Sequence, residues 1–281
     1  MSFIATLAPI MGAWWMGSFM FFNSLSGVLY AFGKLMGLLA VYFILLQFIL
    51  MGRAIWLEKT FGLDKLARLH KLTGYLSILF VLLHPIFLIF SYGMDAKKSF
   101  IEQFLDFFYN YEDISSATFA VLIFISIVFF SIYIVRKHLK YETWYYIHLL
   151  TYLGVLLAFG HQLELGSDFF TTPWLVYYWY ALYIFVFGNL LLFRFLKPLY
   201  QFYRQGFFVS DVVMETSDTT SIYIQGKNLN TLKAEAGQFF IVRFLAKGYW
   251  WQAHPFSLSW IPKNNRLRIT AKNCGDFTAT L

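Results

Sequence analysis

The chain has 281 residues, of which 59% are hydrophobic, 22% are aromatic and 13% are charged. Soluble domains carry about 25% charged residues, so this composition excludes an ordinary soluble protein and predicts a membrane protein. The net charge of +7 does not indicate a nucleic-acid partner, because the basic residues gather at the ends of apolar runs, as in cytoplasmic loops. The single cysteine, Cys274, excludes an internal disulfide, and no Cys-x-x-Cys-His sequence is present for covalent haem attachment.

Six apolar runs are long enough to cross a bilayer as helices, since a bilayer core about 30 Å thick needs roughly 20 helical residues. The first run starts at residue 3 without a basic n-region or a small-residue cleavage site, so we expect a retained helix. We predict a membrane all-α six-helix bundle with spans at about residues 4–22, 33–52, 69–92, 116–135, 143–163 and 173–196.

The charges between the spans predict the orientation of the bundle. Lysine and arginine residues follow spans two, four and six, and such residues stay on the cytoplasmic side. The connection after span three carries five acidic residues against two lysines, and the connection after span five carries Glu164 and Asp168, so both belong outside. We therefore expect a six-pass protein of the plasma membrane, surrounded by lipid, with both termini in the cytoplasm.

Four of the six histidines fall in spans three and five, where ionisable side chains are costly and usually functional. His70 and His84 are 14 residues apart and His148 and His161 are 13 apart, so each pair spans roughly 20 Å of helix. Both spans run outward, which places His70 level with His148 and His84 level with His161. Opposed imidazoles at two levels predict two non-covalent b-type haems, each with two histidine ligands.

These histidines have two other interpretations. A single helical histidine more often satisfies only a hydrogen bond, but four at matched levels are harder to explain in that way. A histidine-lined proton pathway without haem is the second alternative, and it predicts a colourless protein.

The spacing also predicts irregular helices. An ideal helix turns by about 100° per residue. Two residues 14 apart therefore lie within about 40° of each other around the helix axis, whereas two residues 13 apart lie about 140° from each other. We therefore expect span five to bend at Gly154 or Gly160. Pro85 directly follows His84, so we expect a kink in span three.

Cationic side chains at the membrane edges are candidates to pair with anionic haem propionates. Arg53, Arg68 and Lys71 are the candidates on the inner side. Lys34 is the only charged residue in the first 52, and we expect it to pair with an outer propionate or to attract an anionic acceptor or product. The alternative for Lys34 is a side chain that extends to the membrane interface.

After Gly206 the sequence period changes from helix to strand. We predict a partial antiparallel β-barrel over residues 201–281, after the membrane domain of residues 1–200. Its β-rich segments are 207–215, 219–225, 238–244 and 267–271. Two short motifs stand within it, His-Pro-Phe-Ser-Leu-Ser from His254 and Gly-Asp-Phe-Thr from Gly275. On its own, the first motif also fits a proline-containing edge strand.

The six spans, the two histidine pairs and the two motifs together resemble the NADPH oxidase and ferric reductase superfamily, and most of all its bacterial NADPH oxidase members. The resemblance covers about residues 30–281 and includes Arg-Leu-His-Lys ending at Lys71 and Tyr-Glu-Thr-Trp starting at Tyr141. It implies that His70, His84, His148 and His161 are the axial haem ligands, and that Lys34 stands in the place of a basic residue near the outer haem.

The resemblance also implies FAD as a cofactor. Four residues of the first motif would contact its isoalloxazine and ribityl region: His254, Pro255, Phe256 and Ser257. Backbone amides and a hydroxyl can hold phosphate oxygens, so the second motif would lie near the pyrophosphate: Gly275, Asp276, Phe277 and Thr278.

By the same resemblance, the chain belongs to an enzyme in which NADPH reduces FAD and electrons cross the membrane through two haems to oxygen, which becomes superoxide. No obligate protein partner is implied. One alternative is the reduction of a ferric chelate by the same chain of carriers. Another is a haem-bearing subunit that receives electrons from a separate donor or quinol.

Two departures from the family pattern matter. Leu88 stands four residues after His84, where some eukaryotic oxidases have a further histidine, so we expect a simpler oxygen site. The nicotinamide-binding domain, with its Gly-rich turn, would need more than about a hundred further residues. We therefore expect this chain to be part of a longer protein, with an incomplete barrel and no NAD(P)H turnover of its own.

Overall fold

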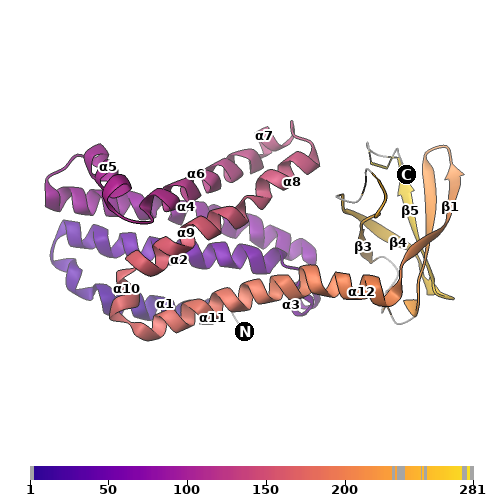
Figure 1. Ribbon diagram of the computed structural model, residues 1–281, viewed down its shortest axis with the longest axis horizontal. Coiled ribbons are helices and arrows are strands. Elements are labelled where there is room, and N and C mark those ends of the chain that lie inside the picture. The colour runs from indigo at the N-terminus through magenta and orange to yellow at the C-terminus, as the bar shows by residue number, and fades with distance from the viewer. Residues whose placement is uncertain are drawn as a thin grey trace. The chain divides into compact units, whose positions relative to one another are not determined.

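The computed structural model describes residues 3–229, 232, 238–247, 249, 252–273 and 277–278. The chain divides into two compact units, Met1–Arg194 and Phe195–Leu281. The first unit is helical, and the second holds a helix followed by a β-sheet (Figure 1).

The described helical stretches confirm the predicted six-helix bundle. Six of them are long and apolar enough to cross a membrane: Ala5–Asn23, Leu25–Met51, Leu63–Ala96, Ile114–Ser131, Tyr141–Glu164 and Pro173–Gln205. In order, the helical elements of residues 3–196 are α1 (Phe3–Ser18), η1 (Phe19–Asn23), α2 (Leu25–Met51), α3 (Ile55–Phe61), α4 (Leu63–Ala96), α5 (Phe100–Asn110), α6 (Ile114–Ser131), α7 (Tyr133–Arg136), α8 (Tyr141–Leu149), α9 (Thr151–Leu165), α10 (Ser167–Thr171), α11 (Pro173–Leu190) and η2 (Leu191–Leu196).

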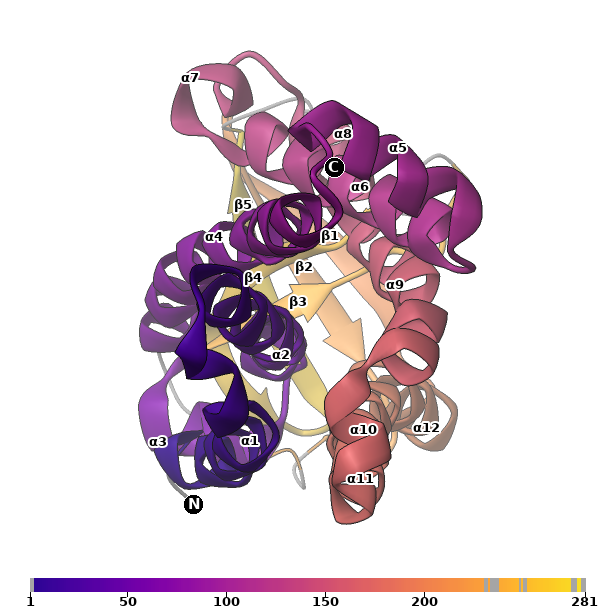
Figure 2. The same ribbon diagram turned by 90° about the vertical axis from the view of Figure 1, so that its left-hand side faces the viewer.

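Helix α2 packs most extensively against α4 and also contacts α1 and α11. Figure 2 shows α2 between α1 and α4. Small residues on α2 permit the close approach of α4: a Cβ atom at Gly33 would lie 2.7 Å from Leu88, and one at Gly37 would lie 2.7 Å from Nδ1 of His84. The position of His84 therefore depends on glycine in the neighbouring helix.

The fifth span is irregular, as predicted, but the break lies elsewhere than expected. Helix α8 ends and α9 begins on either side of Leu150, whose backbone N–H donates to the Ile147 carbonyl at 3.1 Å. The predicted bend at Gly154 or Gly160 is therefore wrong in position. These glycines permit close packing instead. A Cβ atom on Gly154 would lie 2.9 Å from the Phe124 ring, and one on Gly160 would lie 3.1 Å from the Asp113 carboxylate.

The second unit begins with α12 (Lys197–Gln205) and continues as an antiparallel sheet with strand order β1-β2-β5-β4-β3. The strands are β1 (Phe208–Thr216), β2 (Thr219–Gln225), β3 (Phe239–Val242), β4 (His254–Lys263) and β5 (Arg266–Lys272). Alternate residues of β2 and β5, such as Ile222 and Ile269, fill the core of this unit. The described strands form an open sheet, so the closed part of the predicted barrel is not seen in these residues.

The His-Pro-Phe-Ser-Leu-Ser motif begins strand β4, which lies between β3 and β5 in the sheet. Its first residues, His254–Ser257, pair with β3, and the pairing with β5 begins at Leu258. As a whole, β4 is therefore an interior strand, but its proline-containing start pairs on one side only. Pro255 is tolerated because its missing N–H precedes the ladder with β5.

Candidate functional site

The structure brings together the two predicted histidine pairs. The ring centres of His70 and His148 are 5.9 Å apart, with an interplanar angle of 64°. Those of His84 and His161 are 6.0 Å apart, with an angle of 69°. A metal about 2 Å from one nitrogen of each ring places the ring centres roughly 6 Å apart, so both pairs have the spacing of two axial ligands.

The fixed tautomer of His84 suits a metal ligand. Its Nδ1 lies 2.8 Å from the backbone carbonyl oxygen of Gly33. A carbonyl oxygen only accepts, so this nitrogen must carry the proton, which leaves the lone pair on Nε2. The neighbouring helix α2 thereby orients the ring.

The other three rings are oriented in different ways. The side-chain amide of Gln47, also on α2, lies 2.8 Å from Nδ1 of His70. Trp144 stacks on His148, with ring centres 5.3 Å apart and planes at 28°. Nδ1 of His148 and Nδ1 of His161 are buried and have no hydrogen-bond partner among the described residues. Unpaired buried nitrogens are costly, so these rings retain an unmet capacity to bind a partner.

A cavity of about 290 Å³ opens between the helices at the level of His84 and His161, and both histidines line it. Most of its other lining residues are aliphatic or aromatic and come from α2, α4, α6 and α9. A flat apolar group that needs one ligand above and one below would be recognised by such a site. The paired imidazoles and this cavity therefore fit a haem at this level.

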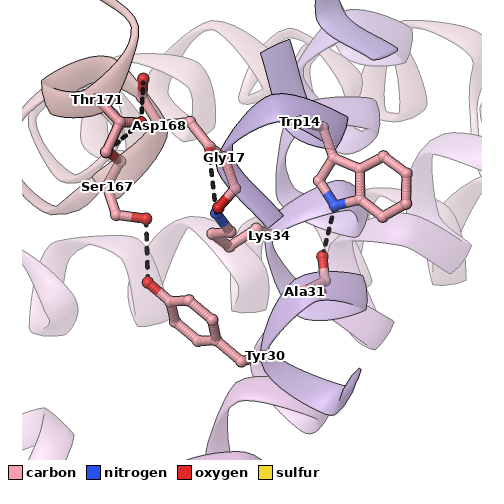
Figure 3. A network of polar contacts seen from close by, with 8 residues as sticks. All are labelled: Trp14, Gly17, Tyr30, Ala31, Lys34, Ser167, Asp168 and Thr171. Carbon is pink, nitrogen blue, oxygen red and sulfur yellow. Dashed lines mark hydrogen bonds and ion pairs between the residues drawn. The ribbon is translucent and has the colours of Figure 1, made fainter. Parts of the chain in front are cut away.

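Lys34 lies inside the bundle beside this cavity, at the centre of a polar network (Figure 3). Its Nζ is 2.7 Å from Oδ1 of Asp168 and donates to the Gly17 carbonyl at 3.0 Å. The side chains of Lys34 and Asp168 are 9% and 5% exposed. Burial raises the pKa of the Asp168 carboxyl, and the hydrogen bond from Lys34 opposes that rise. Lys34 therefore points inward and not toward the membrane interface.

Sequence reasoning missed the pairing of Asp168 with Lys34. From the sequence alone, Asp168 was only one of the acidic residues in an outer connection. It is 134 residues away from Lys34 in the chain, so no local pattern links the two. The one available signal was that a lone lysine in a membrane span needs an acidic partner.

The basic residues predicted to pair with haem propionates on the inner side do not form a buried network like that of Lys34. Nε of Arg53 is 3.0 Å from a carboxylate oxygen of Glu58, so this arginine already has an acidic partner. Arg68 and Lys71 are exposed on α4, on either side of His70. Sequence reasoning also missed Arg194, which donates to the Met51 carbonyl at 3.0 Å and to the Tyr145 hydroxyl at 3.1 Å, near His148.

In the sheet unit, Phe277 of the second predicted flavin motif has ring contacts with His254 and Phe256 of the first. The ring of His254 stacks on that of Phe277, with centres 3.8 Å apart and planes at 24°. Phe256 is buried in the core of the sheet, whereas Pro255 is exposed. Gly275 and Asp276 lie outside the described residues. The described residues thus bring the two motifs together, and contacts with FAD stay a prediction.

No group of three or more histidine, cysteine, aspartate or glutamate side chains lies close enough to hold a metal ion in the described parts of the chain. Each histidine pair therefore offers no more than two side-chain ligands of these types among the described residues. This number of protein ligands suits a haem, whose porphyrin supplies the remaining ones.

Comparison with protein families gives two matches, one in each unit. A family described as the ferric reductase like transmembrane component matches residues 36–159, and an FAD-binding domain family matches residues 205–281. The chain has the domain architecture of the NADPH oxidase and ferric reductase superfamily. This architecture indicates an oxidoreductase that binds FAD and transfers electrons across a membrane.

Within this superfamily assignment, the matched regions cover most of the candidate site. The transmembrane match includes His70, His84 and His148 and ends two residues before His161. The FAD-binding match includes both flavin motifs. A search of curated proteins found no significant match. The closeness to bacterial members stays a prediction.

Proposed function

We propose that this chain is the membrane and flavin-binding part of an NADPH oxidase in the plasma membrane, with both termini in the cytoplasm. In this proposal, electrons from cytoplasmic NADPH pass through FAD and two b-type haems to oxygen on the outer side, and superoxide is the product. NADPH would bind a further domain. The observation that supports the proposal most is the presence of two histidine pairs with ring centres about 6 Å apart at two levels.

Each part of the chain has a role in this proposal. Haem and FAD, when bound, supply carriers that exchange single electrons. His70 with His148, and His84 with His161, would occupy both faces of their cofactors and leave no vacant coordination position for an acceptor. The acceptor would instead take the electron at the edge of the cofactor held by His84 and His161, where the surrounding wall is mostly apolar.

The mainly apolar surroundings of His84 and His161 favour oxygen as the acceptor, because a small neutral molecule loses little hydration free energy when it enters them. A second candidate function is the reduction of a ferric chelate, since the matched transmembrane family is described as ferric reductase like. A haem subunit fed by a separate donor is disfavoured, because such a subunit would not need the matched FAD-binding domain.

The experiment that separates these functions uses the purified full-length protein with NADPH. Superoxide formation in air is measured beside ferric reduction under anaerobic conditions. We expect superoxide formation to exceed ferric reduction. Ferric reduction without any superoxide would overturn the oxidase proposal and support the second candidate.

A further inference from the structure

The short helix α10 forms part of the wall of the cavity that holds His84 and His161. Ser167, Asp168 and Phe169, all in α10, line the cavity. In Figure 1, α10 lies at the same end of the helical unit as α5, on the left. An acceptor that enters from this end of the unit would therefore pass close to α10.

Two polar contacts tie α10 to α2. Nζ of Lys34 is 2.7 Å from the Asp168 carboxylate, and the Tyr30 hydroxyl donates to Oγ of Ser167 at 3.0 Å (Figure 3). Tyr30 and Lys34 are four residues apart, so they project from the same face of α2. We call these four residues the α10 latch.

The latch also joins α1, and its fit is close. Lys34 donates to the carbonyl of Gly17 in α1 at 3.0 Å. A Cβ atom at Gly17 would lie only 2.4 Å from Oδ1 of Asp168, so a larger residue would push the carboxylate away. Beside this contact, Phe169 packs edge-on against the buried Trp179, with ring centres 5.4 Å apart. Three helices thus hold α10 in one place.

The ion pair in the latch presents little net charge to a ligand. Lys34 and Asp168 are both buried and compensate each other at 2.7 Å. Removal of one partner would leave an uncompensated charge in a site of low dielectric constant, which is strongly unfavourable. The ammonium group of Lys34 is therefore engaged within the protein and not presented to an anionic acceptor.

We propose that the α10 latch is a specificity determinant: it keeps α10 over the cavity, so that oxygen reaches the level of His84 and His161 while bulky, charged ferric chelates do not. The inference rests on the proposed oxidase function. In either reaction one electron leaves the protein, and it converts oxygen to superoxide or a ferric chelate to its ferrous form. The latch acts on access alone and takes no part in the electron transfer.

The test uses the purified full-length protein reduced with dithionite, freed of excess reductant and mixed with oxygen or, without oxygen, with ferric EDTA. The return of the oxidised haem spectrum gives one rate for each acceptor. We expect Asp168→Asn, Lys34→Met and Tyr30→Phe to raise the rate with ferric EDTA by about tenfold, within the range by which pocket contacts discriminate. The rate with oxygen should change far less.

The double variant Lys34→Met/Asp168→Asn separates closure from charge, because it removes the contact and leaves no net charge. We expect it to react with ferric EDTA as rapidly as the single variants. Wild-type behaviour of the double variant would show that the single variants act through their uncompensated charge and not through the lost contact, and would overturn the closure proposal. Gly12→Ala in α1 is the matched control, since a Cβ there meets nothing within 4 Å.

Haem content is measured first for every variant. Tyr30→Phe keeps the ion pair and removes one hydroxyl, so it tests the latch even if the charge variants fail to fold. Unchanged chelate rates in variants with intact haem would overturn the latch proposal alone. A wild-type protein that reacts rapidly with ferric EDTA and forms no superoxide would instead overturn the proposed oxidase function.

Discussion

At the scale of single residues, the spacing of the histidines allowed the site to be predicted in outline. Their 14- and 13-residue separations predicted two levels, and the structure pairs the same rings at 5.9 and 6.0 Å. The orientation of each ring was not predictable, because it depends on contacts from other helices. The carbonyl of Gly33, which fixes His84, is one such contact, and a backbone oxygen leaves no trace in the sequence.

The role of Gly37 gives a prediction at this scale. A Cβ there would lie 2.7 Å from Nδ1 of His84, on the side from which the Gly33 carbonyl orients the ring. We expect Gly37→Ala to displace His84 and to reduce haem content by about one per chain, since crowding of a packed interior shifts side chains and backbone. Haem content per chain and the low-spin absorption spectrum measure this.

Gly188→Ala is the control for that substitution, because a Cβ at Gly188 meets nothing within 4 Å. It should retain the haem content of the wild type. Full haem content in Gly37→Ala would show that the contact between α2 and His84 does not determine ligation.

At the scale of elements, the apolar runs predicted all six spans, because length and hydropathy decide membrane insertion. The break in span five was predicted from angles, but it lies at Leu150 and not at a glycine. Glycine permits a bend without requiring one, and here packing against Phe124 and Asp113 explains Gly154 and Gly160. Tertiary contacts of this kind are not visible in a single sequence.

Helix α5, which lies outside the candidate spans, gives a prediction of pH dependence. Its capping box joins Ser99 and Glu102, and the hydrogen bonds from Ser99 hold the pKa of the Glu102 carboxyl below its usual value. A carboxyl with a lowered pKa in the folded state stabilises the helix at neutral pH. This contribution is lost as the pH falls from the ordinary glutamate range through the lowered value.

Hydrogen exchange of α5, corrected for the intrinsic effect of pH, measures this contribution. We expect the protection of α5 to fall at acidic pH in the wild type, and to fall less in Glu102→Gln, which has no carboxyl to titrate. Glu112→Gln, beyond the end of α5, is the matched control. Equal acid sensitivity in the wild type and Glu102→Gln would contradict the assigned role of the cap.

At the scale of the whole molecule, the order of domains was predictable because the change from helical to strand periodicity at Gly206 is abrupt. The position of β4 in the interior of the sheet was not predictable, since a proline more often marks an edge strand. The pairing of Lys34 with Asp168 was also hidden, because the chain passes through three further spans between them.

The predicted orientation in the membrane is tested by cysteine labelling in intact cells. The native chain has one cysteine, Cys274, which should be protected from an impermeant maleimide in the cytoplasm. We expect Glu112→Cys to be labelled from outside and Lys137→Cys to be labelled only after the membrane is permeabilised, following the positive-inside rule. The reverse pattern would contradict the assigned orientation.

The central claim is that the two histidine pairs hold two haems, and haem content tests it most directly. The purified protein should show a low-spin b-type spectrum and about two haems per chain, since each pair supplies two axial ligands. Substitution of any one histidine by alanine should remove about one haem, the one bound by its own pair. A colourless protein, or single-histidine variants that all retain the full haem content, would contradict the account.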